Sequence, residues 1–267
     1  MKTTIWSFYN MKGGVAKSTS TLNIGTELSE TYGLKVLLVD NDPQANLTEL
    51  LGVESEDLEY TIADVLMSSD KKENIKLEDI VVQLRDNLYL VPSSIELSSA
   101  DMHLHSVIFG RERVLGNSLK ELLSKYHFDV VLIDNQPSMS LLPLNSLSCS
   151  DYVIVPCSTE YLSHRGLKLI QKTFEQVRDN LNPNIKMFGV IATKFKKATM
   201  HHREILEWLE DNYNVLGVVH DSVKVPDAAY HESGSVVLSS PKTQPAISYK
   251  EITEKIYNEI MKGSGKE

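Results

Sequence analysis

The chain has 267 residues, of which 42% are hydrophobic and 24% charged, a composition typical of globular proteins that excludes intrinsic disorder. Its 27 Lys and Arg residues stand against 36 Asp and Glu residues, and the net charge of -9 excludes a protein that coats nucleic acid through its overall charge. Two cysteines are too few for a disulfide framework, and no apolar run approaches the roughly 18–20 residues of a membrane helix. We therefore expect a cytoplasmic protein without stable membrane association.

Short apolar runs of strand length alternate with longer helix-like stretches along the chain. The predicted strands span residues 4–9, 35–39, 88–91, 130–133, 152–155, 187–192 and 215–219. The predicted helices span residues 18–32, 115–126, 166–180 and 202–213. Several strands are almost continuously apolar, as expected of parallel strands that are covered on both faces. The alternation predicts a single α/β domain over residues 1–267, with a doubly wound, mostly parallel sheet flanked by helices.

Two further segments belong to this single domain. The most polar stretch, about 54–76, is interpreted as a helical insertion. Isoleucines recur at i, i+4 spacing between 249 and 261 and predict a C-terminal helix that docks on the domain through one apolar stripe. The polar, glycine-containing residues 262–267 are expected to form a flexible tail.

A glycine-rich loop connects the first predicted strand to the first predicted helix. Glycines allow backbone N–H groups to approach phosphate oxygens, and the start of the helix adds a partial positive charge. In this position Lys17 reaches the β- and γ-phosphates of a nucleotide, and the Ser18 hydroxyl is placed to bind Mg²⁺. The loop residues expected at the phosphates are Lys12, Gly13, Gly14, Val15, Ala16, Lys17, Ser18 and Thr19.

Carboxylates follow two other predicted strands. Asp40 and Asp42 lie two residues apart after the strand at 35–39, a spacing that suits a site using water and a metal ion. Asp134 directly follows the apolar strand at 130–133, which has the form of a Walker B strand whose last Asp holds the Mg²⁺ shell.

A second lysine, Lys12, lies immediately before the glycines and makes the sequence pattern of the loop more specific. The pattern Lys-Gly-Gly-x-x-Lys-Ser resembles the deviant Walker A motif of the ParA/MinD ATPases, and residues 40–44 resemble that family's Asp-x-Asp-Pro-Gln segment. The resemblance runs from Thr3 to about residue 260. The most similar subgroup is the Soj-like ParA proteins without an N-terminal helix-turn-helix, because the loop already begins at Asn10.

This resemblance implies an Mg²⁺-dependent ATPase that segregates DNA. ATP would drive formation of a sandwich homodimer that binds DNA without sequence specificity, at the nucleoid. Hydrolysis to ADP and phosphate, stimulated by a ParB-like centromere-binding adaptor, would release the dimer. Plasmid, chromosome, phage and mobile-element cargo all fit.

The family also implies roles for individual residues. Lys12 would reach across the dimer interface to the partner's phosphates, where a cation stabilises transition-state charge. Asp42 would orient the attacking water, which makes Lys12, Lys17 and Asp42 the catalytic candidates. Metal binding falls to Ser18, Asp40 and Asp134, and His220 and Asp221 are carried over as neighbours of the nucleotide base.

The chain departs from the family pattern at several positions. Ala16 replaces a usual glycine, and Asn135-Gln136-Pro137 replaces the usual x-Pro-Pro after the Walker B aspartate. Ser158 stands where glutamine is common, and Asp221 where arginine is common. None of these changes removes a group that we assign to phosphate or metal.

A basic cluster interrupts the acidic sequence within residues 194–203. Phosphate contacts without base contacts make DNA binding nonspecific and steeply salt-dependent. A solvated lysine cluster is the alternative interpretation. The predicted DNA-binding residues are Lys194, Lys196, Lys197 and Arg203, together with Lys224, which corresponds to a family arginine.

Two other functions remain open at this point. A MinD-like ATPase for positioning cell division would need a membrane-binding C-terminal helix, but glutamates at 251, 254 and 259 favour docking on the domain. A regulator that hydrolyses ATP very slowly also fits. His201 and His202 are expected on the surface, and both cysteines are expected to be inert thiols.

Overall fold

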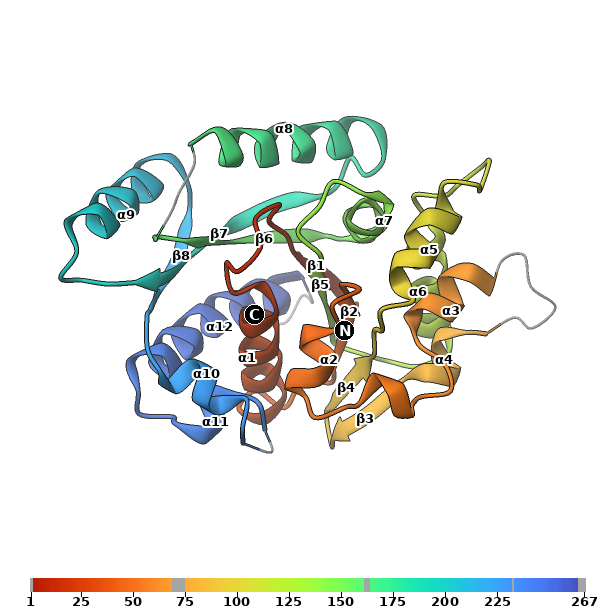
Figure 1. Cartoon of the computed structure of the whole chain (residues 1–267), viewed down its shortest axis with the longest axis horizontal. Helices are drawn as coiled ribbons and strands as arrows, with labels where there is room; N and C mark the ends of the chain where they lie inside the picture. The colour runs from red at the N-terminus through yellow and green to blue at the C-terminus, as the bar shows by residue number, and fades with distance from the viewer. Residues whose placement is uncertain (1, 69–74, 161–163, 232, 264–267) are drawn as a thin grey trace.

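The computed structural model describes residues 2–68, 75–160, 164–231 and 233–263 (Figure 1). Within these ranges an eight-stranded sheet has the order β3-β4-β2-β5-β1-β6-β7-β8. All neighbouring strands pair in parallel except the β3–β4 pair, which is antiparallel. The strands are β1 Thr4–Phe8, β2 Val36–Asn41, β3 Val82–Arg85, β4 Leu88–Val91, β5 Val130–Asn135, β6 Tyr152–Ser158, β7 Lys186–Phe195 and β8 Val215–His220.

Helices cover both faces of this sheet, as Figure 1 shows, so the predicted doubly wound α/β fold is confirmed. One face of the sheet packs against α1 and α12. On the opposite face, α3, α5, α6 and α7 cover β2, β4 and β5, whereas α8 and α9 cover β6 and β7. The helices are α1 Lys17–Glu30, α2 Asn46–Leu50, α3 Ile62–Met67, α4 Leu77–Ile80, α5 Leu97–Leu104, α6 Val114–Lys125, α7 Leu141–Cys149, α8 His164–Asn180, α9 Met200–Asn212, α10 Lys224–Ala228, α11 Val236–Ser239 and α12 Gln244–Gly263.

The ends of β2 and β5 differ from the prediction in a way that matters for the site. Both strands continue two residues further than expected, so that Asp40 and Asp134 lie within the sheet and pair in register. Side chains alternate between the faces of a strand. Leu38 and Leu132, two residues before the aspartates, belong to the core that includes α1. Asp40 and Asp134 therefore face α1 and the loop before it.

The polar insertion contains less helix than predicted. Residues 55–57 form a short 3-10 helix and α3 follows, whereas residues 69–74 lie outside the described part of the chain. The edge strand β3 was missed because it is short and only half-buried, and a two-residue turn at Asp86 and Asn87 joins it to β4. Short, exposed edge strands carry little hydrophobic periodicity.

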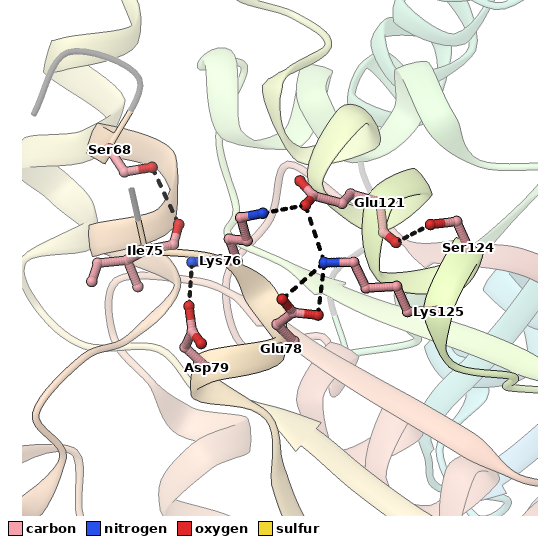
Figure 2. Close-up of polar contacts among 8 residues, drawn as sticks. All are labelled: Ser68, Ile75, Lys76, Glu78, Asp79, Glu121, Ser124 and Lys125. Atoms are coloured by element: carbon pink, nitrogen blue, oxygen red, sulfur yellow. Dashed lines mark hydrogen bonds and ion pairs between the residues drawn. The ribbon is translucent and has the colours of Figure 1, made fainter. Parts of the chain in front are cut away.

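Ion pairs hold the end of the insertion against α6 (Figure 2). Lys125 Nζ donates to both carboxylate oxygens of Glu78, at 2.9 and 3.0 Å, and to Glu121 at 3.3 Å. Lys76 Nζ donates to the same Glu121 oxygen at 2.6 Å. All four side chains are partly exposed, so this network orients α4 on α6 but contributes little to stability.

The C-terminal helix α12 begins five residues earlier than predicted and closes one face of the sheet. Ile252, Ile256 and Ile260 are fully buried, and the Tyr249 hydroxyl lies 3.3 Å from Ser20 Oγ of α1. Residues 264–267 of the expected tail lie outside the described residues. Within the described ranges, no helix has the combination of length and apolarity that membrane spanning requires.

Candidate nucleotide-binding site

The loop between β1 and α1 is fixed to two neighbouring strands. Asn10 Nδ2 donates to the Pro156 carbonyl at 2.7 Å, and Asn10 Oδ1 accepts the Lys12 N–H at 2.9 Å. The Thr193 hydroxyl of β7 donates to the Val15 carbonyl at 3.1 Å. These hydrogen bonds hold the loop in a curved shape, and a loop fixed by the protein itself suits a phosphate site.

Two loop residues adopt the left-handed conformation that this curvature requires. Gly14 has a φ of 69° and Ala16 a φ of 65°. Ala16 is also the residue that precedes the first turn of α1. Its methyl group makes this conformation costly, so the substitution of the usual glycine is accommodated at the expense of local strain.

The Lys17 ammonium group is buried between the loop and the carboxylates. Its side chain is 7% exposed, and Nζ donates to the Lys12 carbonyl at 3.3 Å. Burial lowers the pKa of Lys17, while the nearby charges of Asp134 and Asp42 raise it. Solvent stabilises a buried ammonium group only in part, and an anionic phosphate would stabilise its charge further.

Asp134 is fully buried, and neither of its carboxylate oxygens has a hydrogen-bond partner among the described residues. Burial raises its pKa well above the ordinary value and Asp40 adds to the rise, while Ser18 and Lys17 act in the opposite direction. An orphaned carboxylate is costly unless a cation compensates it. These oxygens therefore fit a hard divalent cation such as Mg²⁺.

Asp40 has a different environment from Asp134. Its Oδ2 accepts the Thr48 backbone N–H at 2.9 Å and the Thr48 hydroxyl at 2.7 Å, and its Oδ1 accepts the Asp42 N–H at 3.2 Å. Burial nevertheless raises the pKa of Asp40 to about 7. Asp40 thus anchors the loop that carries Asp42, a contribution that sequence reasoning missed because Thr48 belongs to no recognised motif.

The phosphate loop between β1 and α1 and the loop of residues 42–46 both line a cavity of about 740 Å³. Asp42 is 6% exposed and lines this cavity, with its Oδ1 accepting the Gln44 N–H at 2.9 Å. The predicted base neighbours His220 and Asp221 also line this cavity, and the His220 ring packs edge-on against Phe195 with 5.2 Å between the ring centroids. Apolar residues also line this cavity: Val219, Val223, Val225, Pro226, Ala229 and Tyr249.

Comparisons with known proteins show the family to which the chain belongs. Residues 3–187 match a family described as an AAA domain. The chromosome-partitioning ATPase Soj of Thermus thermophilus is 30% identical over 251 residues, which cover 92% of each chain. The chain belongs to the ParA/MinD family of P-loop ATPases.

Two solved structures resemble this ParA/MinD ATPase over nearly its whole length. A plasmid partition protein of Borrelia burgdorferi bound to AMPPNP is 28% identical, with a TM-score of 0.80 over 97% of this chain and 100% of that one. Cobyrinic acid a,c-diamide synthase of Mycobacterium smegmatis, bound to an ATP analogue and magnesium, is 31% identical, with a TM-score of 0.82 over 98% and 97%. The chain is an ATPase.

The predicted basic cluster is less basic in this ATPase than its sequence indicated. Lys196 Nζ lies 3.2 Å from Asp221 and 3.7 Å from Glu160, and Lys194 Nζ also lies 3.7 Å from Glu160. These acids come from other segments of the chain, so the sequence of residues 194–203 did not indicate them. Lys224 pairs with Asp227 at 3.4 Å. Lys197 and Arg203 are exposed and form no ion pair with any described residue.

The expectation that both His201 and His202 lie on the surface was also wrong. His201 is exposed, but His202 is 6% exposed and its Nδ1 lies 2.8 Å from the Thr159 hydroxyl. The same nitrogen accepts the Lys196 N–H at 3.4 Å. His202 therefore supports the turn that presents the basic residues, and only the α9 periodicity, with Ile205 and Leu209 on the same buried face, could have indicated this.

Proposed function

We propose that this ParA/MinD ATPase is a DNA-partition ATPase that works as an ATP-sandwich dimer. The observation that carries the proposal is the position of Lys12. Its backbone is held by Asn10 and Lys17 inside the phosphate loop, while its side chain is exposed at the outer edge of that loop. In the proposed dimer, this exposed lysine reaches the phosphates bound by the second molecule, where its charge stabilises the transition state.

Within one protomer, the described residues supply a complete set of roles for phosphoryl transfer to water. The loop N–H groups and Lys17 bind the phosphates, and this positioning is the main contribution that such catalysis requires. Ser18 and Asp134 would hold Mg²⁺ directly or through water, with Asp40 behind them. Bound Mg²⁺ supplies charge neutralisation at the β- and γ-phosphates. Asp42 orients the attacking water at the cavity wall.

No group of three or more His, Cys, Asp or Glu side chains among the described residues surrounds a common point. Mg²⁺ commonly keeps several waters and is bound by one or two carboxylates together with substrate phosphates. The two proposed protein ligands, Asp134 and Ser18, agree with this mode of Mg²⁺ binding, and the nucleotide and water would provide the remaining ligands.

The partners follow from the relatives and from the surface. Partition proteins among the relatives and structures favour DNA as the surface on which the dimer moves, and a ParB-like adaptor as the stimulator of hydrolysis. Nonspecific DNA would be contacted by Lys197 and Arg203 together with Lys194, Lys196 and Lys224, which places the ATP-bound protein at the nucleoid. The apolar face of α12 is buried in the domain and is not available to a membrane, which disfavours a MinD-like role.

The deciding experiment is Lys12→Ala, followed by nucleotide binding and light scattering. We expect ATP binding to persist, because Lys17 and the loop backbone remain, and ATP-dependent dimerisation to be lost. Lys242→Ala is the matched control, since this exposed lysine lies outside the loop. A Lys12→Ala protein that still dimerises with ATP contradicts the proposed role. Turnover measured with and without DNA and the product of the neighbouring gene then tests the adaptor.

A further inference from the structure

We propose that Asn41 and Asn135 are positioning residues that hold Asp40 and Asp134 in place from the opposite face of the sheet. The inference rests on the proposed metal-binding role of these aspartates. Asn135 occupies the unrestricted first position of the segment that corresponds to the family's x-Pro-Pro pattern, so the pattern itself does not account for an asparagine there.

The two asparagines form a buried pair directly beneath the carboxylates. Asn41 and Asn135 are the last residues of β2 and β5 and are opposite each other in register, one step after the Asp40–Asp134 pair. Both are fully buried, and Asn41 Nδ2 donates to Asn135 Oδ1 at 3.0 Å. Because side chains alternate along a strand, this amide pair projects away from α1 while the carboxylates face it.

The pair is connected to two further elements. Asn41 Nδ2 also donates to the Leu142 carbonyl of α7 at 3.0 Å. Asn135 Nδ2 donates to the Phe8 carbonyl at 3.1 Å, at the end of the strand that leads into the phosphate loop. The Ser146 hydroxyl of α7 donates to Asn135 Oδ1 at 2.5 Å. One network thus joins the ends of β1, β2 and β5 to α7.

The chemistry of this network favours a positioning role over simple packing. It borders an otherwise apolar core that contains Val39, Ile133 and Leu142, where a leucine would satisfy packing without desolvating an amide. The Asp134 oxygens have no hydrogen-bond partner of good geometry among the described residues, although Ser18 and Lys17 lie close enough to lower its pKa, so its backbone carries much of its positioning. The neighbouring Asn135 fixes that backbone where the regular strand ladder ends. Both Nδ2 groups and Asn135 Oδ1 are hydrogen-bonded, whereas the buried Asn41 Oδ1 has no partner among the described residues. Asn135 is therefore the more fully bonded of the two, and such bonding favours a single rigid arrangement.

The test uses leucine, which matches asparagine in shape, in the variants Asn41→Leu, Asn135→Leu and the double variant. Binding of a fluorescent ATP analogue is measured against Mg²⁺ concentration and again in EDTA, together with the urea midpoint of unfolding. We expect the Mg²⁺ concentration for half-maximal tight binding to rise about tenfold in Asn135→Leu, because residues behind metal ligands typically contribute that much. Binding in EDTA should change little, since the phosphate loop remains intact.

The double variant separates positioning from folding. Replacing both partners by apolar groups of similar shape restores much of the stability that one unpaired amide loses. We expect its urea midpoint to recover toward wild type while its Mg²⁺ requirement stays raised. If the Mg²⁺ requirement recovers together with stability, the pair is merely structural and the inference is wrong.

Asn145→Leu is the matched control. Asn145 is also fully buried in α7, but it bonds the Leu115 N–H and the Arg111 carbonyl, away from the carboxylates. Asn145→Leu should lose stability without a change in Mg²⁺ requirement. A rise in its Mg²⁺ requirement equal to that of Asn135→Leu would overturn the inference. Asp134→Asn tests the proposed function itself. If this variant keeps the wild-type Mg²⁺ requirement, the metal role of Asp134 fails, whatever the asparagine variants do.

Discussion

Ala16 shows how a single methyl group changes the phosphate loop. Its φ of 65° lies in the left-handed region, where a residue with a Cβ is strained and glycine is not. We predict that Ala16→Gly raises the free energy of unfolding of the nucleotide-free protein by about 1 kcal/mol, the release of strain exceeding the added freedom of the unfolded chain. Urea unfolding measures the change.

A control of opposite sign comes from Ala63, which is buried within α3. Ala63→Gly should lower the free energy of unfolding, by about 1 kcal/mol, because glycine is unfavourable inside a helix. If Ala16→Gly lowered stability as Ala63→Gly does, the conclusion that the Ala16 backbone is strained would be wrong.

Gly234 is required for a different reason, the close approach of two backbones beside the cavity. It has a φ of 59°, and a Cβ added to it would lie 1.8 Å from the Leu50 carbonyl oxygen at the end of α2. We predict that Gly234→Ala weakens ATP binding, because the 234 backbone lines the cavity and must move. Gly52→Ala is the matched control: its φ is 73° but a Cβ there meets no atom within 4 Å. Equal losses of ATP affinity in both variants, measured by titration, would contradict the steric argument.

At the scale of the elements, the ends of β2 and β5 make the stability of the metal-free protein depend on pH. Burial raises the pKa of Asp40 to about 7 and the pKa of Asp134 well above its usual value. Both groups titrate near pH 4 in an unfolded chain. Above that pH the native state binds more protons than the unfolded state, so the free energy of unfolding falls as pH rises from about 4 to about 7.

We therefore predict that the urea midpoint in EDTA decreases between pH 5 and pH 8, and that Asp134→Asn reduces this decrease. The substitution removes a buried carboxylate that has no hydrogen-bond partner of good geometry among the described residues, so the variant should be more stable than wild type at pH 8. Mg²⁺ with ATP should stabilise wild type more than the variant, in which the phosphate loop binds the nucleotide without the Asp134 carboxylate. Asp86→Asn, in the exposed β3–β4 turn, should keep the wild-type pH profile. A pH profile for Asp134→Asn equal to that of Asp86→Asn would exclude Asp134 as the source.

The side-chain contacts at the ends of β2 and β5 could not be predicted from the sequence, unlike the phosphate loop and the strands. The placement of Lys17 and Ser18 at the start of α1 was predictable because the loop and the helix are contiguous in sequence. The apolar strands were predictable because parallel strands are buried on both faces. The pairing of Asn41 with Asn135 and of Asp40 with Thr48 was not, since it depends on strand register and on a short helix that packing determines. The half-buried β3 was missed for the related reason that an edge strand has a weak pattern.

At the scale of the whole molecule, the proposed DNA binding by a chain of net charge -9 requires a limited basic surface. Pairing with acids from elsewhere in the fold decides which lysines contribute. Lys196 lies between Asp221 and Glu160, whereas Lys197 is exposed and forms no ion pair with any residue that the structure describes. Release of counterions requires a cation that is available to phosphate.

We predict that Lys197→Ala weakens ATP-dependent binding to duplex DNA more than Lys196→Ala does, and that it lowers the slope of log affinity against log salt by about 1. Asp221→Asn should strengthen binding, because it leaves Lys196 with less compensation. Filter binding across a salt series measures both effects, with Lys242→Ala as the control for overall charge. Equal losses in Lys242→Ala and Lys197→Ala would show that overall charge governs binding. A fall in affinity for Asp221→Asn would show that the acid supports the surface and does not mask it.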